Sequence, residues 1–119
     1  MTDLSLHVIT FDCEDPAELA RFWAAVTGRE ADPQRFDAIA SIGLLAGDRP
    51  SFLFQKVEVG PRGNNRVHAD LATSNFDHER SRLIDLGAHW VRDSAEHGIR
   101  FTTFTDPEGN KFDLIEPRR

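Results

Sequence analysis

The chain has 119 residues, of which 39% are hydrophobic and 29% are charged, a composition typical of one soluble globular domain. Its 20 acidic and 14 basic residues give a net charge of -6, which argues against general nucleic-acid binding because that requires a basic face. No apolar run approaches the roughly 20 residues of a membrane span, no signal peptide is visible, and the lone Cys13 excludes a disulfide framework. We therefore expect a cytoplasmic protein that binds neither membranes nor nucleic acid.

The clearest local signal is a helix over residues 15–27. Asp15, Pro16 and Glu18 have the order of an N-cap, a first-turn proline and a capping-box acid. Apolar residues then recur at helical spacing, at Leu19, Phe22, Trp23 and Val26. Gly28 follows where a glycine commonly ends a helix, so the pattern predicts a helix with one apolar stripe.

Strand and turn signals surround this helix and recur in the second half of the chain. β-branched and aromatic runs predict strands at residues 4–13, 35–45, 51–59, 66–73, 88–92, 99–105 and 111–117. A second helix is expected to be capped by Ser74, to run to about Leu86 and to end at Gly87. The most turn-rich segment, residues 60–65, is expected to link the two halves.

The two halves have the same order of elements and nearly the same length. The helix-ending glycines Gly28 and Gly87 lie 59 residues apart, and Phe52 and Phe112 lie 60 apart. A repeated supersecondary unit accounts for this most simply. We predict one domain over residues 1–119 with a first module at about 1–60 and a second at about 66–119.

Three segments give the chain a family resemblance: residues 12–23, residues 65–71, and residues 106–114 with a DPEGN turn that leads into a strand. Together they resemble the vicinal oxygen chelate superfamily, most closely its glyoxalase-like branch, which also resembles bleomycin-resistance proteins. The resemblance implies an α+β fold of two βαβββ modules that form a curved mixed-sheet cup. It also implies a homodimer, and a divalent metal held by first-strand and last-strand side chains.

The second module matches the family at two ligand positions. His68 matches the first-strand ligand, and Asp70 shares its face of the strand because side chains alternate with period two. Asp113 matches the last-strand carboxylate, which is usually a longer Glu in the family, and it points away from its neighbours Phe112 and Leu114. Without a metal, His68 would be a hydrogen-bonded pocket residue and Asp113 an edge-exposed charge.

The first module departs from the family pattern. By the 60-residue offset Leu53 is the counterpart of Asp113, and leucine cannot bind a metal. Gln55 lies on the same face as Leu53 and could only partly replace a carboxylate. We expect Gln55, Asp70 and Leu53 to line the ligand-binding cup.

His7 is the metal-ligand candidate of the first module, although the 59-residue offset places Ile9 rather than His7 opposite His68. If His7, His68 and Asp113 converge, they form a two-histidine, one-carboxylate set suited to Fe, Mn, Ni or Zn. The resemblance then implies a metal-dependent lyase, isomerase, transferase or dioxygenase acting on a small molecule with vicinal oxygens. If they do not converge, the alternative is a metal-free drug- or metabolite-binding protein of the bleomycin-resistance type.

Overall fold

The structure is a computed structural model that describes residues 6–48, 50–58, 68–96 and 99–116. The chain divides into two compact units, Met1–Gly60 and Pro61–Arg119. The segment predicted as the link, residues 60–65, lies outside the described residues. Neither helix of the described chain is long and apolar enough to cross a membrane.

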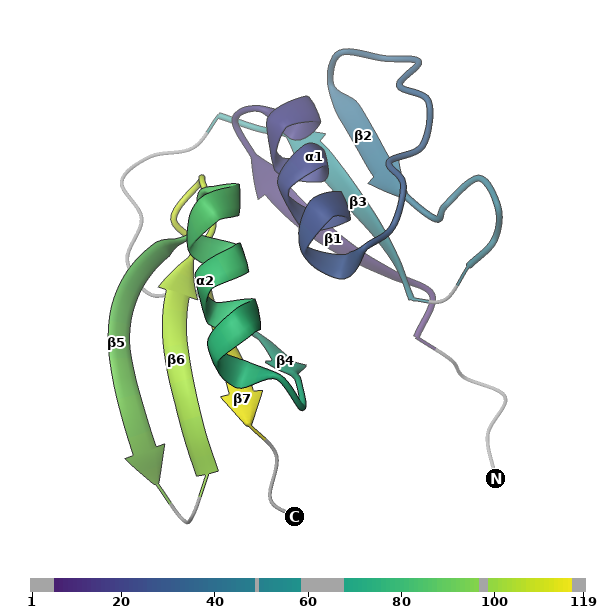
Figure 1. Cartoon of the computed structure of the whole chain (residues 1–119). Helices are drawn as coiled ribbons and strands as arrows, with labels where there is room; N and C mark the ends of the chain where they lie inside the picture. Colours follow the sequence, from purple (N-terminus) through teal and green to yellow (C-terminus); the bar gives the residue numbers. More distant parts are fainter. Residues whose placement is uncertain (1–5, 49, 59–67, 97–98, 117–119) are drawn as a thin grey trace. The chain divides into compact units, whose positions relative to one another are not determined.

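The first unit has one helix on one face of a three-stranded sheet (Figure 1). Its elements in chain order are β1 (Val8–Cys13), α1 (Pro16–Thr27), β2 (Ile39–Ile42) and β3 (Ser51–Lys56). The strand order is β1-β3-β2, in which β1 and β3 are parallel and β2 and β3 are antiparallel. The sheet is therefore mixed, as predicted.

The signals that predicted α1 act as expected at both ends of the helix. The Asp15 carboxylate accepts a hydrogen bond from the backbone N–H of Glu18 at 3.2 Å, and Pro16 is the first helical residue. Gly28 takes a left-handed φ of 68° that allows the chain to turn out of the helix. The predicted helix is thus confirmed.

The apolar stripe of α1 packs on aromatic side chains of the first sheet. Leu19 and Trp23 are buried, and the Trp23 ring lies 5.6 Å from that of Phe11 on β1. Phe11 in turn stacks on Phe54 of β3 at 5.1 Å. The odd-numbered residues of β1 therefore face α1, and Thr10 faces the other side of the sheet.

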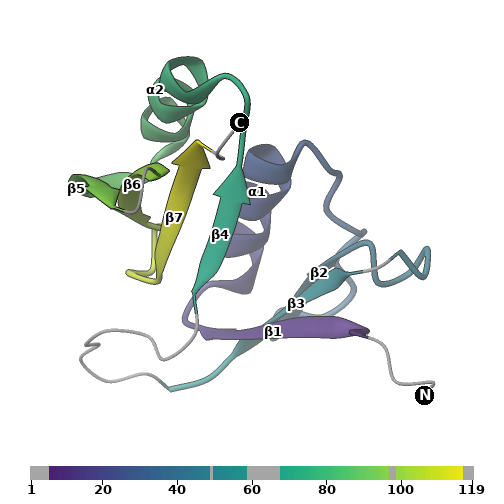
Figure 2. The same cartoon turned by 90° about the horizontal axis from the view of Figure 1, so that it is seen from below.

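The second unit also has one helix on one face of its sheet (Figure 2). Its elements are β4 (Ala69–Ala72), α2 (Phe76–Leu86), β5 (His89–Glu96), β6 (Ile99–Thr105) and β7 (Lys111–Glu116). The strand order is β4-β7-β6-β5, with β4 and β7 parallel and the other pairs antiparallel. This unit has the predicted βαβββ order.

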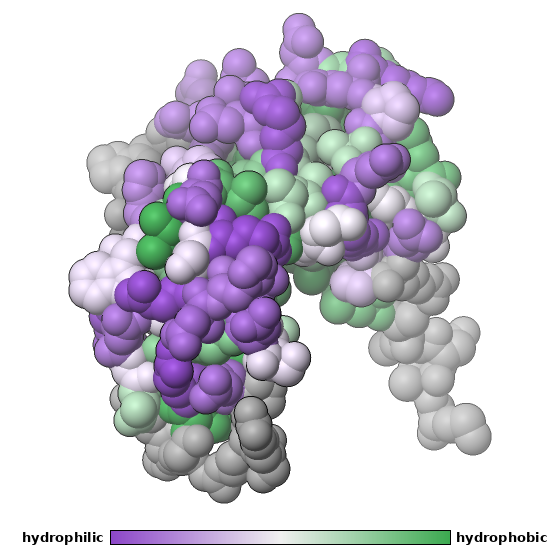
Figure 3. All heavy atoms as spheres, viewed as in Figure 1, coloured by the Kyte–Doolittle hydropathy of each residue, from purple (hydrophilic) through white to green (hydrophobic). Residues whose placement is uncertain are grey.

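The helix α2 begins differently from the prediction. Asn75 rather than Ser74 is the N-cap residue, and its side chain makes no capping bond. The turn before the helix is closed instead by the Thr73 hydroxyl, which accepts from the backbone N–H of Asn75 at 3.0 Å. Only Phe76 and Leu83 of α2 are buried, and its visible side in the space-filling view is mainly hydrophilic (Figure 3).

Polar contacts also fix which face of the second sheet α2 covers. Arg80 of α2 bonds to Asp93 of β5, and Asp93 accepts a further bond from Thr102 of β6. Arg100 of β6 pairs with Asp77 of α2. Even-numbered residues of β6 therefore face α2, and odd-numbered ones lie on the opposite face.

The fold class is confirmed as α+β with two small mixed sheets. The described part of the first unit, however, has one strand fewer than the second, and its strand β2 is shorter than predicted. Where the second unit has β5, the described part of the first unit has no strand but two isolated bridges to β2, Ala31 with Ile42 and Phe36 with Ile39. The strand predicted at 35–45 is reduced to Ile39–Ile42, and Phe36 outside it is 67% exposed. The strand predicted at 88–92 extends instead to Glu96, past an irregularity in pairing after Trp90.

Candidate metal centre

The candidate site lies on the face of the second sheet opposite α2, which we call the distal face. Side chains alternate between the two faces along β7. Phe112 and Leu114 are buried beneath α2, so Asp113 between them lies on the distal face. Strand register aligns Asp70, Asp113, Thr103 and Arg92 in one row across the four strands. Because paired residues share a face, these four residues define the distal face.

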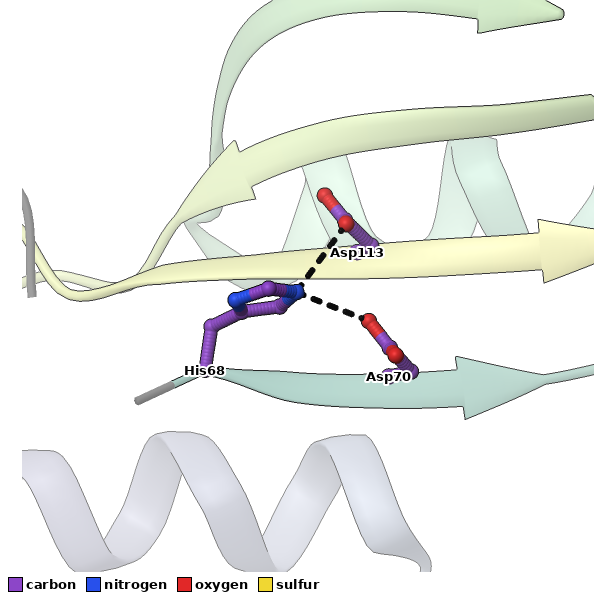
Figure 4. A group of neighbouring side chains, drawn as sticks. All are labelled: His68, Asp70 and Asp113. Carbon is purple, nitrogen blue, oxygen red and sulfur yellow. Dashed lines mark ion pairs between the residues drawn. The ribbon is translucent and has the colours of Figure 1, made fainter. Parts of the chain in front are cut away.

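His68, directly before β4, is in contact with both carboxylates of this row (Figure 4). Its Nε2 lies 3.1 Å from Oδ1 of Asp70 and 3.4 Å from Oδ2 of Asp113. One ligand atom from each of the three residues lies within 4.8 Å of the other two. The structure therefore brings together His68, Asp70 and Asp113, three residues that the sequence analysis singled out.

Burial differs across the cluster. The His68 and Asp70 side chains are 49% and 52% exposed, whereas that of Asp113 is 18% exposed. The buried Thr103 donates its hydroxyl hydrogen to Oδ1 of Asp113 at 2.6 Å. This bond occupies one oxygen of Asp113, while Oδ2 is the oxygen nearest to His68.

The donor chemistry of the cluster fits a divalent cation. A neutral imidazole and two carboxylates supply one nitrogen and oxygen ligands with two negative charges, a set that suits Mn, Fe, Ni or Zn. Coordination by Nε2 requires the imidazole to be unprotonated at that atom. Both carboxylates already converge on that same nitrogen.

The strand register relates this cluster to positions in the first unit. Thr10 pairs with Leu53 as Asp70 pairs with Asp113, and both partners are offset by 60 residues. The prediction that Leu53 is the counterpart of Asp113 thus agrees with the pairing. The same offset makes Val8 the counterpart of His68, so the predicted match with Ile9 was wrong by one residue. The spacing between Gly28 and Gly87 aligns the ends of the two helices, whereas the strand register aligns the strands of the two units directly.

The other predicted site residues belong to the first unit. His7 lies directly before β1, and its carbonyl accepts hydrogen bonds from the backbone N–H and the hydroxyl of Ser51. Gln55 donates to Oδ1 of Asp12 at 2.7 Å, and Leu53 is half-buried on β3. Their contacts with a metal or a ligand stay predictions.

Thr103 is the residue of the site that sequence reasoning missed. A threonine within a strand usually reflects β propensity and carries no functional signal by itself. Only the pairing of Thr103 with Asp113 across β6 and β7 gives it a role. That pairing follows from the tight turn at 106–110, in which Asp106 accepts hydrogen bonds from the backbone N–H groups of Glu108 and Asn110.

Comparison with known proteins places this architecture in a family. The family model of the glyoxalase-like domain matches residues 8–115. The chain belongs to the glyoxalase-like domain family. The three motif segments of the sequence predicted this glyoxalase-like family. A search of the curated proteins found no match.

Solved structures share the fold of the glyoxalase-like domain at low sequence identity. A glyoxalase/bleomycin resistance protein/dioxygenase family enzyme from Burkholderia phytofirmans PsJN aligns at 16% identity with a TM-score of 0.74, over 95% of this chain and 98% of that chain. The fosfomycin resistance protein FosX from Mesorhizobium loti aligns at 16% identity with a TM-score of 0.72, over 99% and 95% of the two chains.

A third structure is a mutant of the genomically encoded FosX from Listeria monocytogenes, in complex with Mn(II) and 1S,2S-dihydroxypropylphosphonic acid. It aligns at 16% identity with a TM-score of 0.74, over 96% of this chain and 90% of that chain. At these identities the likeness concerns the fold alone. That protein nevertheless binds a divalent metal and a molecule with two adjacent hydroxyl groups on this fold.

Proposed function

We propose that this glyoxalase-like domain binds a divalent cation through His68 and Asp113 and uses it to act on a small molecule with vicinal oxygens. The observation that carries the proposal is the approach of His68 Nε2 to Oδ2 of Asp113, at 3.4 Å on the distal face. Both residues occupy positions that the family resemblance assigns to metal ligands. The sequence offers His7 as a further ligand, and the geometry offers Asp70.

The residues of the chain have distinct parts in this proposal. His68 and Asp113 hold the cation, and Thr103 fixes Asp113 so that Oδ2 stays directed at the site. The bound cation would act as a Lewis acid on two adjacent substrate oxygens. The reaction class is proposed as a lyase, isomerase, transferase or dioxygenase reaction, and a cytoplasmic homodimer remains the expected form of the protein.

Metal titration of the purified full chain, stripped of metal with a chelator, tests the proposal. We expect Mn(II), Fe(II), Ni(II) or Zn(II) to bind with a stoichiometry near one and to raise the melting temperature. His68→Ala and Asp113→Asn should each abolish this binding. His78→Ala and Asp85→Asn are matched controls, because both residues lie exposed on α2 and should leave binding unchanged. A wild-type chain that binds none of the four ions would overturn the proposal.

A second candidate function is metal-free binding of a small drug or metabolite. It is favoured by the first unit, where the counterparts of His68, Asp70 and Asp113 are Val8, Thr10 and Leu53. These side chains offer one hydroxyl and no strong metal ligand. Quenching of tryptophan fluorescence by planar ligands, in the presence of a chelator, tests this candidate. Saturable binding that His68→Ala leaves unchanged would support it, and the absence of any saturable binding would remove it.

A further inference from the structure

We propose that Asp70 is the third protein ligand of the cation, so that the second unit alone supplies the whole protein ligand set. This inference rests on the proposed function and replaces His7 of the first unit by a residue of β4. The set would then consist of His68, Asp70 and Asp113, all on the distal face of one four-stranded sheet.

Asp70 approaches His68 at least as closely as Asp113 does. Asp70 Oδ1 lies 3.1 Å from His68 Nε2, closer than the 3.4 Å of Asp113 Oδ2. The parallel ladder between β4 and β7 pairs Asp70 directly with Asp113, so the two carboxylates are held side by side. A third donor position therefore already exists within the unit that carries the other two.

The imidazole of His68 faces two carboxylates, those of Asp70 and Asp113. Both carboxylates approach the same nitrogen, Nε2, and the N–H at that atom is the donor available to either of them there. When Nε2 coordinates a cation, that hydrogen is absent and both carboxylates lose it as a partner. A cation placed among the three groups takes over the role of the proton for both carboxylates at once. Two adjacent carboxylates would otherwise repel each other across the ladder.

The first unit carries different side chains at the positions equivalent to the cluster. Val8, Thr10 and Leu53 occupy the repeat positions equivalent to the cluster, and none of them supplies an imidazole or a carboxylate. A ligand set confined to the second unit would leave coordination positions free for water or for the two oxygens of a substrate. The absence of an imidazole or a carboxylate at these three positions of the first unit and the presence of Asp70 in the second unit are thus complementary.

Binding of Mn(II) to the full chain, measured by calorimetry, provides the first test. We expect Asp70→Asn to weaken Mn(II) binding about 100-fold or more, and His7→Ala and Asp85→Asn to change it less than about twofold. A tenfold or greater loss in His7→Ala would overturn the inference. If Asp70→Asn binds like the wild type while His68→Ala does not bind, Asp70 is not a ligand and the proposed function stands. If the wild type itself does not bind Mn(II), the proposed function fails.

Affinity alone cannot separate a ligand from a residue that merely orients His68, because the loss of such orienting partners also costs about 10- to 100-fold. The electronic absorption spectrum of the Co(II)-loaded chain makes this distinction. Replacement of a carboxylate ligand by water in Asp70→Asn should change the position and intensity of the d–d bands. An unchanged spectrum at saturating Co(II) would assign Asp70 an orienting role and overturn the inference.

Discussion

Thr103 donates a hydrogen bond to Asp113 at 2.6 Å, across the antiparallel pair of β6 and β7 on the distal face. Thr103 is buried, although the cluster next to it is partly exposed. The bond fixes the rotation of the Asp113 carboxylate, because one of its oxygens is bound to a side chain held by the sheet. Asp113 is a methylene shorter than the Glu that is usual in the family, so its reach toward a cation would depend on this orientation.

Thr103→Val is expected to weaken Mn(II) binding about tenfold, the lower end of what the loss of an orienting partner costs. Valine keeps the shape of threonine but removes the hydroxyl, so the sheet is retained and only the donor to Asp113 is lost. Thr103→Ser keeps the donor and should bind Mn(II) within about twofold of the wild type. Isothermal titration calorimetry measures both variants, and equal binding by Thr103→Val and wild type would contradict the orienting role.

Elements whose signals are local could be predicted from the sequence. Helix α1 was predicted correctly because its cap, its apolar stripe and its final glycine all lie within one short segment. Strand β6 has the predicted bounds, Ile99–Thr105, because its β-branched and aromatic residues also lie within one short segment. The N-cap of α2 was predicted at Ser74 but lies at Asn75. The sequence pattern does not reveal that the Thr73 hydroxyl accepts a hydrogen bond from the backbone N–H of Asn75.

The site was only partly predictable because its parts depend on pairing between distant segments. His68 and Asp113 came from motifs, and Asp70 followed from the strand period. The counterpart of His68 was misplaced at Ile9 instead of Val8, since strand register is set by the ladder and not by helix ends. Thr103 could be found only from the register between β6 and β7.

Asp106→Ala is expected to lower the free energy of unfolding by about 3 kcal/mol, because hydrogen bonds to a buried charged group are stronger than neutral ones. The buried Asp106 carboxylate accepts from the backbone N–H groups of Glu108 and Asn110, each at 2.9 Å. Urea unfolding followed by circular dichroism measures the change. Asp85→Ala, at an exposed position of α2, is the control and should change stability by less than about 0.5 kcal/mol.

Cys13 should react slowly with a thiol reagent such as DTNB in the folded protein and rapidly in urea. Its side chain is fully buried at the end of β1, and its thiol contacts the backbone carbonyl of Gln55 at 3.6 Å. A buried thiol in apolar surroundings is a poor nucleophile. Reaction of the native chain at the rate of a free small thiol would contradict this structural role.

Because of Asp32, the free energy of unfolding of the first unit is expected to vary with pH in the acid range. Burial raises the pKa of this carboxyl, but hydrogen bonds from the Ser41 side chain and from the backbone N–H groups of Leu45 and Leu44 outweigh burial and hold the pKa below its ordinary value of 3.8. The Ser41 hydroxyl lies 2.7 Å from Oδ2 of Asp32, and the Leu44 nitrogen lies 2.9 Å from it. The folded state therefore binds a proton at this carboxyl less readily than the unfolded state.

The sign of the pH dependence follows from that difference. Above pH 3.8 the carboxylate contributes its full stabilisation, and this is lost as the pH falls through the lower folded-state pKa, because the unfolded chain binds more protons there. Asp32→Asn should lower the free energy of unfolding by about 1–2 kcal/mol at pH 7, and its deficit relative to wild type should shrink in strong acid. Urea unfolding between pH 2 and pH 7 measures both curves, with Asp85→Asn as the control. A deficit that stays constant down to the lowest pH would show that the charge of Asp32 is not what its hydrogen-bond donors stabilise.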